Sequence, residues 1–573
     1  MIATVLERLW VERADDIPLL LSSLRKMDLV EKLDACFPRH GNWTGELTFG
    51  EVAVVWLAFA LSEGDHCLNH VEPWAAERLV LLSNLLGKHV RALDFSDDRL
   101  ATFLEATADF DRWSAFQIEL NRGILRVYNL QYDSQGVRVD TTTSYTYSTS
   151  DERAGLFQRG HSKDHRPDLQ QIKICMATLD PLGMPLACCV VAGNSADDPQ
   201  YVPMIQEVQA SLPPDGNTYF MDCKGAAVGT RAFVSESRDY YACPLSGKQV
   251  DANDLQRLIE PVIAKKVQVS AVYHPTDGKE QPADLIARGY SYLERIEGEV
   301  AGTKVKRKWT ERRFVVCSVA HQEHQQKRLQ ERISKSLKDL GRIAERKKGR
   351  KRRTRAQLKE EIDGILDHYE VRDLIAVQLE KASKRVKVRK YKERPERVKT
   401  EVTWHVKACV KEQEYEETRQ RCGWRVYATN NLKMTLADMV LGYRGQFGIE
   451  KGFSRIKNKP LGLNPMYLKN EDRVVGLVNL LGVALRLLTL VEFVVRRNLK
   501  KRDETLQDLY AGQAGRKTAT PSAELLLGAF KGINLFVETS NNGVATGIKP
   551  LSAIQQKILA LLELPPDLYS NLA

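Results

Sequence analysis

The sequence predicts an α/β protein: a mixed sheet preceded by an all-α N-terminal domain and interrupted by a β-rich insertion that contains a helical hairpin. Three observations predict this class. Apolar residues recur at helical spacing through residues 1–130. Beyond Gly136 the pattern changes to runs of β-branched and aromatic residues. Between residues 246 and 430, strand-like runs flank two long helical stripes, so we expect this region to interrupt the sheet.

The composition fits a large chain with a polyanionic partner. At 573 residues it should hold three or four domains, because a single core stops growing near about 250–300 residues. Lys and Arg total 85 against 74 Asp and Glu, which gives a net charge of +11 and a pI near 9.0 and favours nucleic acid as a partner. The 10 cysteines contain no CxxC pair, so the sequence shows no zinc-ligand spacing and suits a reducing cytoplasm.

Residues 1–130 are predicted to form a helical domain. The segments ATVLERLW, IPLLLSSLRKM and FGEVAVVWLAFAL have helical spacing, with turn signals at 38–41 and 63–65. Ser96 is a ready N-cap, so we interpret the acidic residues around it as a helix start and not a metal site: Asp94, Asp97 and Asp98. The domain is a candidate for binding DNA ends, although no recognition helix stands out.

Residues 131–245 are predicted to form the first half of a mixed sheet. VRVDTTTSYTY is strand-like, and its opening run ends in Asp140. IKICMATLDPLGMPLACCVVAGN follows as a hairpin around the turn 180–183. A helix, PMIQEVQASL, leads to NTYFMD, an apolar strand that ends in Asp222, and YYACPL is the last strand. One aspartate at a strand end is usually a turn residue, but two such acids together with a helical glutamate form a more specific pattern.

Residues 246–430 are predicted to form the insertion. Its strand-like runs are VQVSAVYHP, ERRFVVCSV, EVTWHVKACV and GWRVYATN. The helical hairpin, near 320–380, carries two apolar stripes: Leu329, Ile333, Leu337 and Leu340, then Leu358, Ile362, Ile365 and Tyr369. Their connection, ERKKGRKRRTR, has eight basic residues among eleven, including Arg350 and Arg352. This loop suits either plain solvation or a DNA backbone.

The segment 441–457, LGYRGQFGIEKGFSRIK, is predicted to be one helix with Thr435 as its N-cap, within a second half of the core at 431–500. At 100° per residue one narrow sector of this helix carries Tyr443, Gln446, Glu450, Ser454 and Lys457. A carboxylate can hold a divalent metal, and lysine and tyrosine can hold a phosphate. The alternative is a solvated amphipathic face.

The remaining segments are predicted to belong to a soluble chain. The N-terminus lacks the uninterrupted apolar core of a signal peptide. Residues 474–495 could imitate a membrane span, but Asn479, Arg486 and Glu492 break this segment, so we expect a buried core helix. Residues 501–573 are predicted to form short helices, including AELLLGAF and AIQQKILALLEL.

The chain resembles the DDE transposases of bacterial insertion sequences, in the branch with the helix motif Y-x2-R-x3-E-x6-K and a β-rich insertion before it. Tyr443, Glu450 and Lys457 match this motif in identity and spacing. Gln446 stands where the motif has arginine, which weakens the phosphate clamp of the family. HSKDHRPDLQQ, followed by a hairpin and GNSADD, is also similar to this group, and the resemblance extends over about residues 130–500.

The resemblance implies a ribonuclease H-like core in which Asp140, Asp222 and Glu450 form a catalytic triad. These carboxylates would hold two Mg²⁺ ions, with Mn²⁺ as a substitute. Such enzymes cut a phosphodiester with water and join the freed 3′ hydroxyl to target DNA. The implied partners are the terminal inverted repeats of the element, target DNA and a second copy of the chain, in a nucleoid-associated bacterial protein.

The resemblance also implies residues that contact DNA. Tyr443, Gln446 and Lys457 would lie against a phosphate at the element end. In the polar loop after the first strand, Lys163, His165 and Arg166 are further candidates, with a structural or solvent role as the alternative. In related enzymes an aromatic residue of the insertion stacks on a flipped base, which makes Trp404 and Trp424 candidates, although a core tryptophan is the alternative.

Two other functions stay open from the sequence. A catalytically silent, transposase-derived protein would bind DNA without cutting it, and the departure at Gln446 is compatible with this reading. A metal-dependent nuclease would cut without strand transfer. The intact acids at Asp140, Asp222 and Glu450 favour an active transposase.

Overall fold

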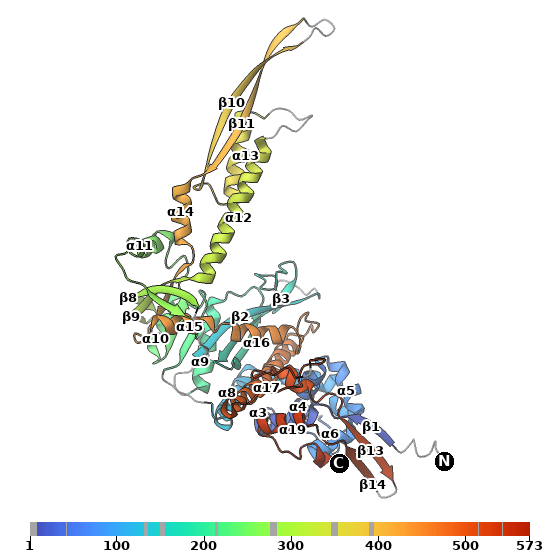
Figure 1. The fold of residues 1–573 in the computed structure, drawn as a ribbon. Coiled ribbons are helices and arrows are strands. Elements are labelled where there is room, and N and C mark those ends of the chain that lie inside the picture. The colour runs from blue at the N-terminus through green and yellow to red at the C-terminus, as the bar shows by residue number, and fades with distance from the viewer. Residues whose placement is uncertain are drawn as a thin grey trace.

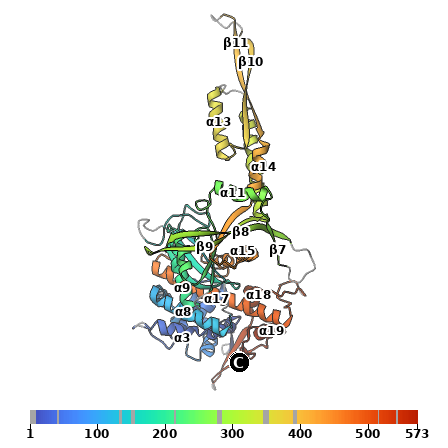
Figure 2. The same ribbon diagram turned by 90° about the vertical axis from the view of Figure 1, so that its left-hand side faces the viewer.

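The computed structural model describes residues 9–39, 41, 43–130, 136–148, 155–212, 216–275, 284–344, 353–388, 395–513, 515–540 and 543–572. In Figure 1 the N-terminal and C-terminal elements lie together at one end of the molecule, and the largest sheet lies above them. A ribbon of strands and the helices that pack along it extend from the opposite end. Figure 2 shows the same arrangement from the side.

The N-terminal region is helical, as predicted, apart from one strand. Strand β1 (Leu9–Arg13) pairs with β13 (Asn534–Ser540), which pairs with β14 (Gly543–Ile548). The expectation of an all-α domain missed β1 because its pairing partner comes from the other end of the chain. The helices are α2 (Ile17–Lys26), α3 (Leu29–Cys36), α4 (Phe49–Glu63), α5 (Leu68–Ala76), α6 (Leu79–Leu86), α7 (Asp97–Thr107) and α8 (Phe110–Val127).

A nine-stranded mixed sheet forms the centre of the molecule, in the order β4-β3-β2-β5-β6-β12-β9-β8-β7. Strands β2, β5 and β6 are parallel neighbours, and every other pair is antiparallel. The strands are β2 (Gly136–Thr146), β3 (Gln170–Leu179), β4 (Met184–Ala192), β5 (Thr218–Met221), β6 (Tyr240–Pro244), β7 (Ser270–Tyr273), β8 (Leu285–Glu299), β9 (Lys306–Ser318) and β12 (Trp424–Thr429).

Four strands of the expected insertion belong to this same sheet. β12 pairs with β6, and β9, β8 and β7 follow outward, so residues 246–430 extend the sheet where we expected them to interrupt it. The physical reason is that the backbone groups along the edge of β6 need partners, and β12 supplies them. Strand β8 was not predicted.

The rest of that region forms the projecting arm. Helices α12 (Val319–Ala344) and α13 (Arg355–His368) form the predicted hairpin, and its apolar stripes are buried or partly buried against the ribbon of β10 (Ile375–Val388) and β11 (Arg397–Val410). Strand β10 falls partly in the range predicted as helical. Helix α14 (Glu412–Arg421) leads back to the sheet.

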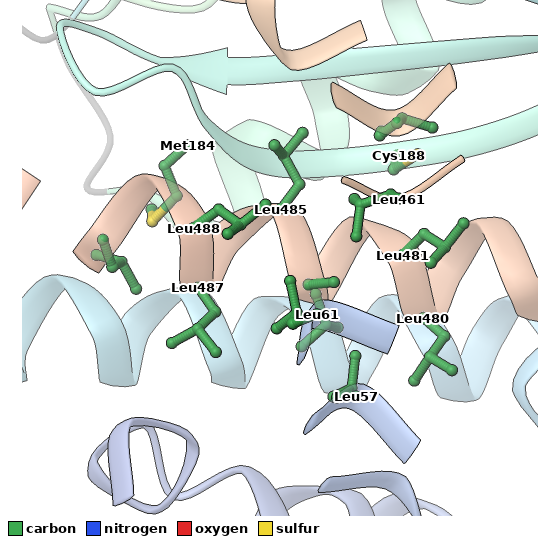
Figure 3. Packing of buried hydrophobic residues seen from close by; sticks show 14 of the residues in the cluster. Leu57, Leu61, Met184, Cys188, Leu461, Leu480, Leu481, Leu485, Leu487 and Leu488 are labelled. Carbon is green, nitrogen blue, oxygen red and sulfur yellow. The ribbon is translucent and has the colours of Figure 1, made fainter. Parts of the chain in front are cut away.

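Helix α17 (Glu471–Arg502) is the predicted core helix, and it joins the sheet to the N-terminal helices. Figure 3 shows leucines of α17, such as Leu481 and Leu487, between Leu57 and Leu61 of α4 on one side and the β4 region on the other. Among the described residues α17 is the one helix long and apolar enough to cross a membrane, but 94% of its most apolar window is buried inside the protein. Arg486, fully buried, donates from Nε to the carbonyl of Pro185 at 2.8 Å.

The remaining helices cover the sheet and the C-terminal end. Helix α9 (Tyr201–Ser211) packs against β3 and β4, and α10 (Val228–Glu236) packs against β6, β8 and β9. Helix α11 (Ala252–Ile263) contacts β12, and α18 (Ala523–Gly528) and α19 (Ala553–Leu562) pack on α17.

The helix expected at 441–457 is broken in two, which corrects the prediction. Helix α15 (Leu436–Arg444) ends before Gly445, and α16 (Phe447–Lys457) begins after Gln446. A Cβ on Gly445 would lie 2.2 Å from Nη2 of Arg138, so the chain approaches this guanidinium more closely than a side chain allows. Tyr443 therefore lies on a different helix from Glu450, Ser454 and Lys457, and the five residues do not share one helix face. The predicted N-cap is confirmed, because the Thr435 hydroxyl accepts from the N–H of Asp438 at 3.1 Å.

Candidate active site

Asp140 and Asp222 occupy neighbouring positions on adjacent strands. β2 and β5 pair in parallel with Val139 opposite Met221, so the two acids are the next residues on each strand. Adjacent strands lie about 4.8 Å apart. Asp222 directly follows its strand, as predicted, whereas β2 continues through Asp140 to Thr146.

The Asp222 carboxylate is held by three donors. The Tyr201 hydroxyl donates to its Oδ1 at 2.6 Å, and the backbone N–H groups of Lys224 and Gly225 donate to the same atom at 2.8 and 3.2 Å. Oδ2 receives no hydrogen bond from the described residues. One oxygen therefore fixes the side chain, and the other remains available.

Asp140 also has one carboxylate oxygen that accepts hydrogen bonds and one that accepts none from the described residues. Its Oδ1 accepts from the backbone N–H of Thr141 at 2.7 Å and from Nζ of Lys163 at 3.1 Å, and no described donor reaches Oδ2. Burial raises the pKa of Asp140, and the charge of Asp222 adds to that effect against the opposing Lys163 ammonium. The two carboxylates therefore repel each other across a half-buried gap, which a cation would relieve.

Glu450 lies in the first turn of α16, a helix that packs against β2 and α17. Its side chain is exposed, and it makes no hydrogen bond or ion pair with the described residues. Glu450 does not close a compact cluster with Asp140 and Asp222. Among the His, Cys, Asp and Glu side chains of the described residues, one group of three could hold a metal ion: Asp65, Cys67 and His70. The ligand atoms of these three residues all lie within 4.8 Å of one another.

Ion pairs to Glu492 and Glu524 connect α16, the helix of Glu450, to α17 and α18, and the pair of Arg455 with Glu492 is buried on both sides. Nζ of Lys451 lies 2.6 Å from Oε1 of Glu492 on α17, and Nη2 of Arg455 lies 2.5 Å from Oε2 of the same residue. Arg455 also pairs with Glu524 at 2.9 Å. Glu492 and Arg455 are 7% and 6% exposed, so removing one partner would leave a buried charge unpaired.

The substitution Glu492→Gln is expected to lower the free energy of unfolding near pH 7 by about 3 kcal/mol. Burial alone would raise the pKa of Glu492, but Arg455, Lys451 and Arg496 outweigh burial and hold this pKa below its ordinary 4.5. A carboxyl with a lowered folded-state pKa contributes stability that is present above the unfolded value and is lost as the pH falls through the folded value.

Urea titrations of both proteins across pH check this prediction. The difference in free energy between wild type and Glu492→Gln should be full at neutral pH and should shrink once the pH falls below about 4.5. A difference that stays constant down to acid pH would show that the Glu492 charge does not anchor α16.

The other residues of the helix motif, Tyr443, Gln446 and Lys457, each have different neighbours in the structure. Tyr443, on α15, lies edge-on to Tyr427 at 5.2 Å between ring centroids, and burial, Tyr427 and Asp222 raise the pKa of its phenol. Gln446 is the N-cap residue of α16, and its buried Oε1 accepts no hydrogen bond from the part of the chain that the structure describes. Nζ of Lys457 is paired with Oδ1 of Asp164 at 2.5 Å.

Of the polar-loop candidates, the structure brings Lys163 to the acids, through its contact with Asp140. Arg166 pairs with Asp168 at 2.8 Å, and its guanidinium lies 5.7 Å from the ring of Tyr147. His165 is exposed.

The residues of the insertion that were predicted to contact DNA differ in their exposure. Trp404 is half-buried on β11, with the Arg355 guanidinium 5.6 Å from its ring centroid. Trp424 is only 5% exposed, and its Nε1 donates to the carbonyl of Gln420 at 3.2 Å, so it is the more deeply placed of the two tryptophans. Stacking of a base on Trp424 therefore stays a prediction, and it would require this strand of the sheet to expose the ring. Arg350 and Arg352 lie outside the described residues.

The comparison with protein families shows to which family the chain belongs. The family model described as "Transposase DDE domain" matches residues 131–487. This chain belongs to the DDE transposases. The match spans both acid-bearing strands and the helix of Glu450.

No curated protein matches this transposase. Among the solved structures that match is a cryo-EM structure of the piggyBac transposase synaptic complex with hairpin DNA. The two chains are 9% identical, and the match covers 87% of this chain and 78% of the other, with a TM-score of 0.32.

DDE transposases generally use divalent metal ions, and two of the three acids fit such an ion in this structure. Asp140 and Asp222 are adjacent, and each leaves one oxygen without a described donor. Carboxylate oxygens are the ligands that Mg²⁺ and Mn²⁺ accept. Glu450 is the third carboxylate of the expected set, and it has no described competing partner.

Arg138 lies beside the candidate site and was not among the predicted site residues. It lies on β2 two positions before Asp140, and its Nη2 donates to the carbonyl of Gly442 at 2.6 Å. Its Nε donates to Oδ1 of Asp180 at 2.8 Å, and its guanidinium lies 4.9 Å from the ring of Phe220. Arg138 therefore joins the strand of Asp140 to the end of α15, just before the break that leads to Glu450. The sequence feature that could have pointed to Arg138 is its place two residues before Asp140, on the same predicted strand.

Proposed function

We propose that this chain is an insertion-sequence transposase that cuts DNA at the element ends and joins the 3′ ends to target DNA. In this proposal Asp140, Asp222 and Glu450 are the catalytic and metal-binding residues of a ribonuclease H-like core. The observation that carries it is the register of β2 and β5, which places Asp140 and Asp222 side by side. The family match and the contact of α16 with β2 support Glu450 as the third acid.

The residues of the site would divide the work. Two Mg²⁺ ions, or Mn²⁺ in their place, supply activation of the attacking oxygen and stabilisation of the leaving oxygen. Oδ2 of Asp140 and Oδ2 of Asp222 would each face a cation, and Tyr201 would keep Asp222 in its orientation. Lys163 would leave Asp140 for a DNA phosphate, because the ammonium and the cation compete for the same carboxylate.

Tyr443 and Lys457 would contact the DNA end. The Tyr443 phenol is protonated at neutral pH, and burial raises its pKa further, so its hydroxyl can donate to a phosphate oxygen near Asp222. Lys457 would exchange Asp164 for a phosphate, an equally anionic partner. The Gln446 amide N–H₂ can donate to a phosphate but supplies no charge, so the clamp at this position is weaker than an arginine clamp.

The larger organisation of the protein is also part of the proposal. Residues 1–130 would bind the terminal inverted repeat, 131–245 and 431–500 would form the catalytic core, 246–430 would form the inserted region, and 501–573 the C-terminal helical region. Two copies would act on paired ends in the bacterial cytoplasm, at the nucleoid. The positive net charge of +11 suits these partners.

The experiment uses purified full-length protein, a duplex that carries the element end, supercoiled target DNA and Mg²⁺. We expect cut ends and products in which the 3′ end is covalently joined to the target, and neither product with EDTA. Cutting without joining would contradict the transposase assignment and indicate a metal-dependent nuclease. Binding without cutting in Mg²⁺ or Mn²⁺ would indicate a silent DNA-binding protein.

A further inference from the structure

The outer part of the β10–β11 ribbon extends away from the helices that support its inner part. The inner pairs, such as Val377 opposite Ala408, pack against α12 and α13, and where the outer part begins the Arg355 guanidinium of α13 lies 5.6 Å from the ring centroid of Trp404. Eight pairs, from Lys381–Trp404 to Val388–Arg397, make up the outer part, which we call the distal ribbon. At about 3.4 Å per residue it is about 27 Å long. Figures 1 and 2 both show it projecting beyond α13.

The distal ribbon is strongly basic. Residues 381–388 and 397–404 contain six Lys or Arg and one acid, Glu401. All six cations are exposed, and none forms an ion pair with a described carboxylate: Lys381, Lys384, Arg385, Lys387, Arg397 and Lys399. An isolated two-stranded ribbon is marginally stable in water, so this geometry suits an element that is held by an anionic partner.

The cations lie on both faces of the ribbon. Side chains alternate between faces along a strand, and residues directly opposite each other share a face. The register therefore places Lys381, Arg385 and Lys387 on one face. The other face carries Lys384, Arg397 and Lys399. A ribbon that lay flat on a surface would need cations on one face only, whereas a groove with an anionic wall on each side would contact both.

We propose that the distal ribbon enters a groove of duplex DNA and contacts the phosphates of both groove walls. The major groove of B-DNA is about 12 Å wide and admits a two-stranded ribbon. The six cations carry the interaction, and the partner is recognised by charge and not by base sequence. This inference rests on the proposed function for its partner, but it concerns DNA beyond the cleavage site and a surface that takes no part in the chemistry.

The test compares two triple variants of the full-length protein, one for each face. One is Lys381→Gln, Arg385→Gln and Lys387→Gln, and the other is Lys384→Gln, Arg397→Gln and Lys399→Gln. The control variant removes three exposed cations at the C-terminal end of the molecule: Lys500→Gln, Lys501→Gln and Lys549→Gln. Binding to a long duplex that extends beyond the element end is measured by fluorescence anisotropy over a series of salt concentrations.

Each ribbon variant is expected to bind the long duplex at least about tenfold more weakly than wild type, and the control variant to bind as wild type does. The slope of log affinity against log salt concentration should fall by about 2–3 for either face, at about 0.9 per lost phosphate contact. Unchanged circular dichroism and melting temperature would show that the variants fold.

Three results would overturn the proposal. Loss of affinity in one ribbon variant only would show that the ribbon lies flat on the DNA. Unchanged affinity in both would show that it does not bind DNA. A fall from dimer to monomer in analytical ultracentrifugation, without a change in the salt slope, would show that the ribbon binds a second copy.

A short duplex that carries only the cleavage site separates this inference from the proposed function. The ribbon variants should cut the short duplex at the wild-type rate, because the distal ribbon lies outside the catalytic region. If wild type fails to cut the short duplex while the ribbon variants still lose affinity for the long one, the proposed function fails and the ribbon proposal stands.

Discussion

Asp140→Asn is expected to lower the rate of end cleavage by at least about a thousandfold, because losing about 4 kcal/mol of metal-mediated stabilisation corresponds to that factor. Asparagine keeps the shape of the side chain but removes the charge that faces Asp222. Binding of the DNA end should be retained within a fewfold. Single-turnover cleavage in Mg²⁺, with binding measured in Ca²⁺, checks both expectations.

Asp198→Asn is the matched control for this prediction. Asp198 is an exposed acid in the segment between β4 and α9, and it makes no ion pair with the described residues. Its replacement should leave the rate unchanged. An Asp140→Asn protein that cuts at more than about a tenth of the wild-type rate would remove Asp140 from the triad, because a metal ligand contributes more than that factor.

Arg138→Met is expected to have the second largest effect, on stability and activity together. The substitution leaves Asp180 without the guanidinium that pairs with it at 2.6 Å, at a cost of about 3 kcal/mol in the free energy of unfolding. It also removes the donor to the Gly442 carbonyl, which fixes the end of α15. We expect end cleavage to fall at least about tenfold, because Glu450 follows this junction.

A double variant separates a positioning role of Arg138 from a role in stability alone. In Arg138→Met with Asp180→Leu both charges are removed, so most of the lost stability should return. Cleavage should stay low, because the link to Gly442 is still absent. Full recovery of cleavage in the double variant would show that Arg138 contributes only to stability.

The acid-bearing strands could be predicted because their signals are local. Asp140 and Asp222 follow short apolar runs that read as strands without knowledge of their neighbours. Their register could not be read from the runs themselves, since parallel pairing depends on the crossover through α9. The hairpin of β3 and β4 and the buried α17 were predicted for the same reason as the acids, from continuous apolar patterns and a clear turn.

The features that the sequence did not reveal depend on distant contacts. The break at Gly445 follows from the approach of Arg138, more than 300 positions earlier in the chain. Lys457 is paired with Asp164 across 293 positions, so its motif spacing did not show that it is already neutralised. Strand β10 mixes charged, polar and apolar residues without a strict alternation, and its pairing with β11 decides its conformation.

The most direct test of the central claim is the anomalous scattering of Mn²⁺ in crystals of the full-length protein bound to an element end. The account predicts Mn²⁺ density in contact with the carboxylates of Asp140, Asp222 and Glu450, and its loss from this position in Asp140→Asn. Density at Asp140 and Asp222 with Glu450 still turned to solvent would contradict the assignment of the third acid. Density found only elsewhere, for example at Asp65, Cys67 and His70, would contradict the whole site.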